Sequence, residues 1–309
     1  MDNKQSKVLI TGASGFLGKE ICETLSKNNT IWTFGRTLTP YNHIYGDLKI
    51  DKIFLAESNL DTIIHLAGKA HSYPKTNEEI EEFYTVNFQG TVNLLKSLEQ
   101  QKRINKFIFA STVAVYGTES GENIDENFPP HPNTPYGLSK LNAENYIIEW
   151  CSKKRIEYLI LRLPLIVGEN PPGNLGKMQK AISKGYYVSI KDNQAKKSVV
   201  LASDIAKLIE TDNWESGIYN LTDGYNPTFR EIEKAYEIAL KKKIRINISI
   251  STLKVIGTIG DKLQKIGVKF PFNSNTLKKM TSSLTFNDNK AREKLNWKPN
   301  SVLEYLANN

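Results

Sequence analysis

The sequence predicts an α/β protein, a doubly wound parallel sheet with a smaller C-terminal lobe. In the first half, short apolar runs alternate with helical patterns, and such alternation produces a parallel sheet covered on both faces. After about residue 165 the alternation gives way to a loop rich in Gly, Pro and Asn at residues 168–174. We therefore expect a sheet domain at residues 1–165 and a lobe at residues 166–309, with residues 219–221 returning to the first domain as a strand.

Each element of the first domain follows from the spacing of its apolar residues. Continuous apolar runs predict buried strands at residues 8–10, 31–34, 61–66, 106–110 and 158–163. A helix follows the first run, because Leu17, Ile21 and Leu25 recur at helical spacing. Longer helices are predicted at residues 78–101 and 135–153.

Composition and charge exclude several classes of protein. The chain has 309 residues, 39% hydrophobic and 24% charged, which is typical of globular proteins. No apolar run approaches the ~20 residues that span a bilayer, and the N-terminus leaves no room for a signal peptide, so we expect a cytoplasmic protein without a membrane partner. Cys22 and Cys151 lack metal-ligand spacing, so we expect buried thiols and no metal.

The net charge is +8, yet the lysines are scattered and only Lys241, Lys242 and Lys243 form a tight run. Without a platform of interleaved aromatic and basic residues, a nucleic-acid partner is not expected. An anionic substrate and cofactor are sufficient reason for the positive balance.

A glycine-rich turn joins the first predicted strand to the first predicted helix. Glycine allows a tight turn and close backbone approach, and a helix N-terminus attracts a pyrophosphate. The strand before the turn and the helix after it are the context that a dinucleotide site requires. We therefore predict cofactor contacts at Gly12, Ser14, Gly15, Phe16, Leu17 and Gly18.

Tyr136 and Lys140 lie four residues apart, so they share one face of the predicted helix. The ordinary pKa of a tyrosine is about 10, and a nearby positive charge favours its phenolate. The pair predicts a proton donor or acceptor that works near neutral pH.

The Thr-Gly-x-x-Gly-x-x-Gly turn and the Tyr-x-x-x-Lys pair together resemble the extended short-chain dehydrogenase/reductase family, or NAD-dependent epimerase/dehydratase family. The resemblance covers nearly the whole chain and implies a Rossmann domain, a nucleotide-sugar lobe and an enzyme of the NAD(P)-dependent kind. It also implies a homodimer, with the helices at residues 78–101 and 135–153 forming a four-helix bundle.

In this family a Ser or Thr four residues before the tyrosine of Val-Tyr-Gly orients the substrate oxygen. That position is Thr112, and the adjacent Ser111 is the alternative. The resemblance implies that Tyr136 is the general acid, that Lys140 lowers its pKa and holds the nicotinamide ribose, and that Thr112 stabilises the developing alkoxide. Related dehydratases carry Asp-Glu after this Thr, whereas this chain has Val113 and Ala114, which leaves ketone–alcohol redox chemistry or epimerisation.

Cofactor choice depends on Arg36, which follows the second predicted strand. An acidic residue there binds the ribose 2′-hydroxyl of NAD, whereas Arg pairs with the 2′-phosphate of NADP. We expect NADP(H), with NAD(H) as the alternative if Arg36 stacks on adenine. Further cofactor contacts implied by the resemblance are Asp47, Leu48, Leu66, Ala67, Gly68 and Asn87, although the family usually has Ala where this chain has Gly68.

Asn174, which ends the loop at residues 168–174, and Leu175, which follows it, fall where a helix N-terminus could receive a substrate phosphate. Lys197 matches the basic residue that contacts the pyrophosphate in the family, with a plain surface lysine as the alternative. Segments near residues 280–284 and 291–299 resemble a subgroup of UDP-hexose 4-epimerase-like proteins and 4-ketoreductases of UDP-2-acetamido-2,6-dideoxy-hexuloses.

The leading expectation is an NADP-dependent 4-ketoreductase of a nucleotide-activated, UDP-linked 4-keto-6-deoxy hexose in surface polysaccharide biosynthesis. The alternative is a UDP-hexose 4-epimerase with tightly bound NAD. A non-catalytic nucleotide-binding scaffold is a third interpretation, but the chain retains both Tyr136 and Lys140.

Overall fold

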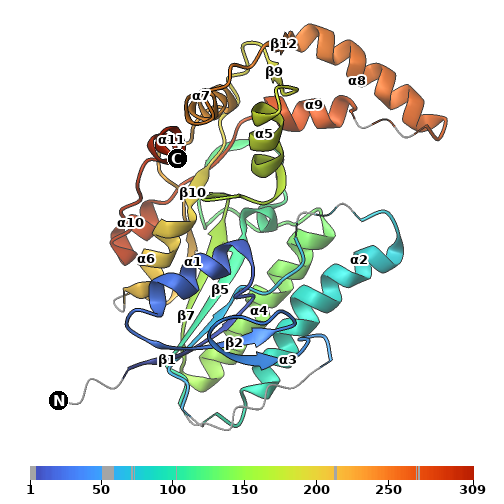
Figure 1. Ribbon diagram of the computed structural model, residues 1–309. Helices are drawn as coiled ribbons and strands as arrows, with labels where there is room; N and C mark the ends of the chain where they lie inside the picture. Colours follow the sequence, from blue (N-terminus) through green and yellow to red (C-terminus); the bar gives the residue numbers. More distant parts are fainter. Residues whose placement is uncertain are drawn as a thin grey trace.

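The computed structural model describes residues 5–309 except 51–58, 71, 73, 102, 212, 213, 269 and 271. Its centre is a seven-stranded sheet in the order β11-β7-β5-β4-β1-β2-β3, with helices on both faces (Figure 1). All six neighbouring pairs are parallel. The predicted doubly wound parallel sheet is therefore confirmed.

The strands of this sheet are β1 (Lys7–Thr11), β2 (Thr30–Gly35), β3 (Asn42–Tyr45), β4 (Thr62–His65), β5 (Lys106–Thr112), β7 (Glu157–Leu163) and β11 (Gly217–Asn220). Apart from β3, which is more polar and has no buried residue, they are short apolar segments with mostly buried side chains. From β1 the order runs to β2 and β3 on one side and to β4 and β5 on the other. This switch between β1 and β4 opens a crevice at the carboxyl ends of the strands, where such sheets bind ligands.

Two hydrophobic clusters hold the helices against the sheet. On one face α1 (Phe16–Leu25) and α6 (Ala202–Glu210) contribute Ile21 and Ile205, and on the other α3 (Gly90–Ser97) and α4 (Pro135–Lys154) contribute Leu94 and Ile147. In the described part of the chain, no helix has both the length and the apolar composition to cross a membrane.

The helix expected at residues 78–101 has an irregular centre. It consists of α2 (Asn77–Phe83), a π-helical turn at Tyr84–Gln89, and α3. The Thr91 hydroxyl donates to the Asn87 carbonyl at 2.6 Å inside this turn. Single π turns are rare and often mark functional sites, and the period of the apolar residues does not reveal them.

The rest of the chain forms small parallel pairs and the helices of the C-terminal lobe. The pairs are β8 (Leu165–Val167) with β10 (Val199–Leu201), β9 (Val188–Ile190) with β12 (Ile246–Ile248), and β6 (Gly121–Ile124) with β13 (Leu284–Phe286). The helices are a 3-10 turn at Val113–Tyr116, α5 (Gly173–Ser183), α7 (Phe229–Ala239), α8 (Ile250–Lys265), α9 (Ser274–Thr281), α10 (Asn289–Leu295) and α11 (Val302–Asn308).

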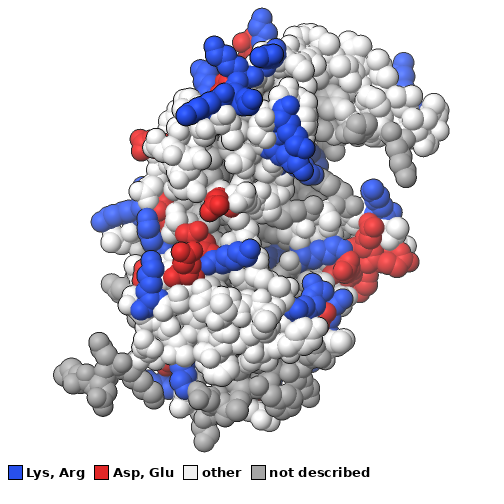
Figure 2. Space-filling view, in the orientation of Figure 1, with Lys and Arg blue, Asp and Glu red and all other residues white. Residues whose placement is uncertain are grey.

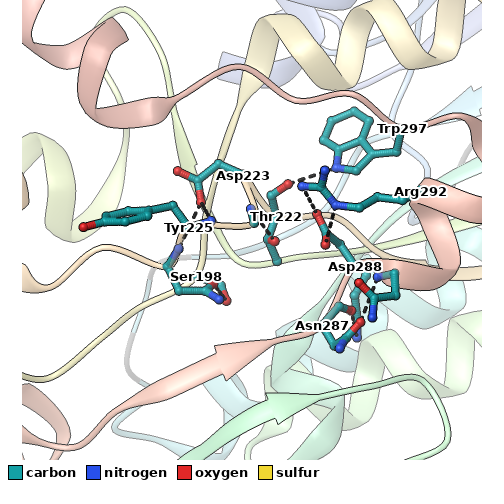
Figure 3. A network of polar contacts seen from close by, with 12 residues as sticks. Ser198, Thr222, Asp223, Tyr225, Asn287, Asp288, Arg292 and Trp297 are labelled. Atoms are coloured by element: carbon teal, nitrogen blue, oxygen red, sulfur yellow. Dashed lines mark hydrogen bonds and ion pairs between the residues drawn. The ribbon is translucent and has the colours of Figure 1, made fainter.

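A polar network anchors the C-terminal tail to the loop that follows β11 (Figure 3). The buried Trp297 indole donates to the Thr222 carbonyl at 2.9 Å, and Arg292 forms a forked pair with Asp288 at 3.0 and 3.1 Å. Asn296 ends α10 in the left-handed conformation, with φ of 52°. The tail therefore packs against a strand of the main sheet and joins the lobe to it.

Candidate active site

Thr112 and Tyr136 meet at the carboxyl edge of the sheet. Thr112 ends β5, and Tyr136 lies in the first turn of α4, which Thr134 caps by accepting from the Gly137 amide at 3.1 Å. The Thr112 hydroxyl lies close enough to the Tyr136 phenol to act on its pKa. Lys140, one turn further along α4, is buried with its amine 4.0 Å from the centre of the Phe109 ring. The three predicted catalytic residues are thus brought to one edge.

The glycine-rich turn beside them fits a dinucleotide. Gly12 has φ of +75°, and a Cβ there would lie 2.6 Å from the Ala67 amide nitrogen. A Cβ on Gly18 would lie 2.2 Å from the Gly12 carbonyl oxygen. Gly15 is the N-cap of α1 and has no side chain to cover the first amides of that helix. The backbone donors of α1 are therefore free to bind a pyrophosphate, as the spacing predicts.

The electrostatics of the pair differ from the expectation. Burial raises the pKa of Tyr136, and the nearby Thr112 hydroxyl opposes that rise. The net direction is upward, whereas we expected Lys140 to lower this pKa. Burial also lowers the pKa of Lys140 to about 7, with the Glu144 carboxylate opposing the change. Burial thus makes the charged form of this amine less favourable, which weakens its pull on the phenol.

A chain of hydrogen bonds runs behind the site from the glycine turn to the π turn. The Ala67 amide donates to the Thr11 hydroxyl at 3.3 Å, and Thr11 lies 2.6 Å from Nδ1 of His65. On the other side Nε2 of His65 lies 2.9 Å from the Thr91 hydroxyl, which donates to Asn87. These directions assign the proton to Nε2. A neutral His65 satisfies both neighbours, and burial, followed by the charge of Lys140, lowers its pKa to about 3.

Asn87 connects this chain to the catalytic helix. Its Oδ1 accepts from the Lys69 amide at 2.6 Å, and its Nδ2 donates to Ser139 at 2.9 Å. A Cβ on Gly68 would lie 3.0 Å from Oδ1 of Asn87 and 3.7 Å from Nζ of Lys140. Glycine at position 68 therefore permits a close approach that alanine would crowd. The Asn87 side chain, predicted to contact the cofactor, makes these bonds within the protein.

A second buried network engages Ser111 and leaves Thr112 outside it. The Ser111 hydroxyl donates to Glu144, whose carboxylate pairs with Arg162 at 2.8 Å. Arg162 also lies over the Tyr116 ring, 4.8 Å from its centre. Because Ser111 is bonded to Glu144, Thr112 is the hydroxyl that faces Tyr136. Sequence reasoning missed Glu144, although its position four residues after Lys140 on one helix was a usable signal.

Arg36 lies near a carboxylate that the sequence argument did not place beside it. Its Nη1 is 3.7 Å from Oδ2 of Asp47, and its side chain is 71% exposed. The Leu48 carbonyl that follows accepts from Asn93 at 2.8 Å. Asp47, itself a predicted cofactor contact, places an acid beside Arg36, so Arg36 does not by itself select a 2′-phosphate.

The remaining residues predicted to contact cofactor or substrate differ in their surroundings. Some have buried side chains and can offer only their backbone, and one side chain is already hydrogen-bonded within the protein. Leu17 and Leu175 are buried in hydrophobic clusters, while Asn174 is exposed in the first turn of α5. Nζ of Lys197 donates to the Lys279 carbonyl at 3.2 Å, and burial lowers the pKa of this amine. Ser14 and Gly15 are exposed, Phe16 and Leu66 are half-buried beside the first cluster, and Ala67 abuts Gly12.

The fold and the residues at its carboxyl edge are those of an NAD(P)-dependent enzyme, and comparison with known proteins gives the family. The model of the NAD dependent epimerase/dehydratase family matches residues 8–211, and the chain belongs to this family. It is 31% identical over 301 residues, 92% of this chain and 88% of the relative, to an N-acetyl-alpha-D-glucosaminyl-diphospho-ditrans,octacis-undecaprenol 4-epimerase from Escherichia coli O157:H7.

A GDP-6-deoxy-D-mannose reductase from Pseudomonas aeruginosa is 34% identical over 147 residues, which are 47% of each chain. Among solved structures, UDP-glucuronic acid 4-epimerase from Bacillus cereus in complex with NAD has a TM-score of 0.75 at 20% identity. That alignment covers 98% of this chain and 94% of the other. At this identity the likeness establishes the shared fold.

Proposed function

We propose that this protein is a 4-epimerase of a hexose joined to a diphosphate, with a nucleotide or a polyprenol as the carrier. The observation that supports this most is the placement of Thr112 beside Tyr136 at the edge where the glycine turn presents the amides of α1. Epimerases among the relatives favour this activity over the 4-ketoreductase expected from the sequence. The name of the Escherichia coli relative supports a polyprenyl carrier beside a nucleotide one.

When bound, NAD(P) supplies the acceptor and donor for hydride at the sugar carbon. In its phenolate form, which the protonated Lys140 and the Thr112 hydroxyl favour against burial, Tyr136 takes the proton of the C4 hydroxyl as general base. It returns the proton to the oxygen after the keto intermediate has turned. Thr112 shares a hydrogen bond with the same oxygen and holds it near Tyr136. Lys140, with a pKa of about 7, supplies positive charge beside the cofactor ribose in its protonated form. Proton and hydride both return to the sugar, so an epimerase consumes no cofactor.

The second candidate function is the NADP-dependent 4-ketoreductase of a UDP-linked 4-keto-6-deoxy hexose, which the exposed Arg36 favours. Here Tyr136 donates one proton to the new alkoxide and NADPH is oxidised in equal amount. An assay with UDP-hexoses, polyprenyl-diphosphate N-acetylglucosamine and 4-keto-6-deoxy UDP-sugars separates the two functions. Interconversion at C4 without cofactor consumption supports the epimerase, and stoichiometric NADPH oxidation supports the reductase.

Replacing Tyr136 with Phe tests the catalytic assignment. Loss of one positioned proton donor lowers kcat by ~10²–10⁴-fold, while cofactor binding measured by fluorescence is retained. Turnover near the wild-type rate would remove Tyr136 from the mechanism.

Replacing Arg36 with Asp tests cofactor choice. If Arg36 binds a 2′-phosphate, this change weakens NADPH binding much more than NADH binding, because the new carboxylate repels the phosphate. Equal dissociation constants before and after the change, measured by calorimetry, would exclude that role.

We also propose the domain division at residues 1–165 and 166–309, with α6 and β11 returning to the Rossmann domain, and a cytoplasmic homodimer in surface polysaccharide biosynthesis. Exposed apolar side chains support pairing through the bundle helices: Ile80 on α2, Tyr84 in the π turn and Leu138 on α4. Light scattering of the purified chain measures this, and a monomer at micromolar concentration would reject the dimer.

A further inference from the structure

Helix α8 exposes an apolar stripe on its outer side. Val255, Ile259 and Ile266, at the end of the helix, are 61%, 48% and 74% exposed. Their intervals of four and seven residues place them on one helical face. In Figure 1 α8 projects from the C-terminal lobe, away from the central sheet, and the visible side of α8 in Figure 2 carries few charged side chains.

The opposite side of α8 is packed against α9, so the stripe belongs to a well-anchored helix. A Cβ on Gly260 would lie 1.9 Å from the Phe272 carbonyl oxygen, which shows how closely the two segments approach. Leu253 packs with Leu277 of α9, and the Ser274 amide donates to Asp261 at 3.2 Å. The inner face of α8 thus packs within the lobe, and the outer stripe faces away from the lobe.

Positive charge lies along α8 and near its N-terminal end. Lys254 and Lys265 are exposed on α8 to one side of the stripe, and the exposed Lys262 lies on the face of the stripe itself. The segment before β12 carries further exposed cations at Lys241, Lys242, Lys243 and Arg245. Residues 240–268 contain seven Lys and Arg against the single acid Asp261, a local charge of +6 in a chain whose net charge is +8. Figure 2 shows Lys and Arg side chains gathered over α7 and the segment leading to β12.

We propose that α8 lies on the surface of an anionic membrane. An amphipathic helix with exposed aliphatic side chains and flanking lysines inserts its apolar face at the headgroup boundary while the lysines contact anionic lipids. The cationic border distinguishes this occupant from a second copy of the chain, whose identical border would repel it. The proposal replaces the sequence expectation that the protein has no membrane partner.

Membrane binding by α8 would also favour a substrate that is itself held in the membrane, and this part of the inference rests on the proposed function. A sugar joined through a diphosphate to a polyprenol is held at the membrane surface by its lipid. An enzyme bound there by α8 meets this substrate in the plane of the bilayer, whereas a free nucleotide sugar needs no such attachment. The lipid contact itself depends only on the stripe and its lysines.

Co-sedimentation with vesicles tests the proposal. The full chain binds vesicles of phosphatidylcholine with 30% phosphatidylglycerol at least ten-fold more tightly than phosphatidylcholine alone, and binding weakens as salt is raised. The triple variant Val255→Ser, Ile259→Ser, Ile266→Ser loses at least ten-fold in affinity. The matched control is Leu38→Ser with Tyr45→Ser, two equally exposed apolar residues on the Rossmann domain, and it binds as wild type does.

Three results would overturn the proposal: equal binding to neutral and anionic vesicles, unchanged binding by the triple variant, or a triple variant that alone shifts from dimer to monomer in light scattering. The last result would make the stripe an interface between copies. Turnover of a soluble UDP-sugar by the triple variant stays at the wild-type rate, because α8 carries none of the proposed catalytic groups. Failure of docking is therefore distinguishable from failure of the proposed activity.

Discussion

Most proteins bury apolar side chains and expose polar ones, and two regions of this molecule do the opposite. The networks behind the candidate active site bury polar side chains, whereas α8 exposes apolar ones. Around the site, His65, Glu144 and Arg162 are buried, and each is hydrogen-bonded. On α8, Val255 and Ile259 are exposed beside lysines. Burying polar groups is tolerated only when each is satisfied, so the first region depends on every partner. The second can lose a side chain without harm to the fold. In the first region, the contacts between residues decide the stability of the fold. On α8, exposed side chains and nearby charge leave the helix face available to bind a partner.

The largest effect is expected from Glu144→Gln, which leaves the buried Arg162 charge without its counter-ion. Breaking one partner of a buried pair costs ~3–5 kcal/mol, measured by urea unfolding. The matched control on the same helix is Glu149→Gln, whose exposed pair with Lys153 is held in water, and its stability is unchanged within error. Equal losses in the two variants would contradict the distinction between the regions.

Gly12→Ala is expected to have the next largest effect. A left-handed residue with a side chain costs ~1–2 kcal/mol, and the contact with the Ala67 amide adds ~1–3 kcal/mol. The control is Gly185→Ala, because Gly185 has a similar φ of +78° and open space where its Cβ would lie. Calorimetry should show the larger loss, together with lost cofactor affinity, only at position 12. Matching losses would mean that the close approach to Ala67 is unimportant.

A smaller effect concerns pH. The pKa of His65 is lowered to about 3, below the ~6.5 of an unfolded histidine. The unfolded chain therefore binds more protons between these values, so stability falls as pH drops through this window, by about 2 kcal/mol from pH 8 to pH 5. His65→Gln removes this part of the slope, whereas the exposed control His131→Gln keeps it. Unfolding curves at several pH values measure this dependence of stability on pH. An unchanged slope in His65→Gln would count against a neutral His65 between Thr11 and Thr91.

Local sequence patterns predicted the elements that place the site. The apolar runs predicted β1, β2, β4, β5 and β7, but not the more polar β3 and β6. The glycine spacing predicted the turn at Gly12, because such a turn depends on residues close in the chain. The helix at residues 78–101 was predicted, but its π turn was not, since the period of the apolar residues does not reveal such a turn. The choice of Thr112 over Ser111 also required the structure, because Glu144 lies on another element and engages Ser111.

The sequence by itself determined the α/β class, the family, the dinucleotide turn and the pairing of Tyr136 with Lys140 on one helix. These features are local, so periodicity and spacing suffice to predict them. Only the tertiary structure decided the raised pKa of Tyr136, the pKa of Lys140 near 7, the acid beside Arg36 and the exposure of the α8 stripe. Burial and charge proximity set all four, and both arise from residues far apart in the chain that folding brings together.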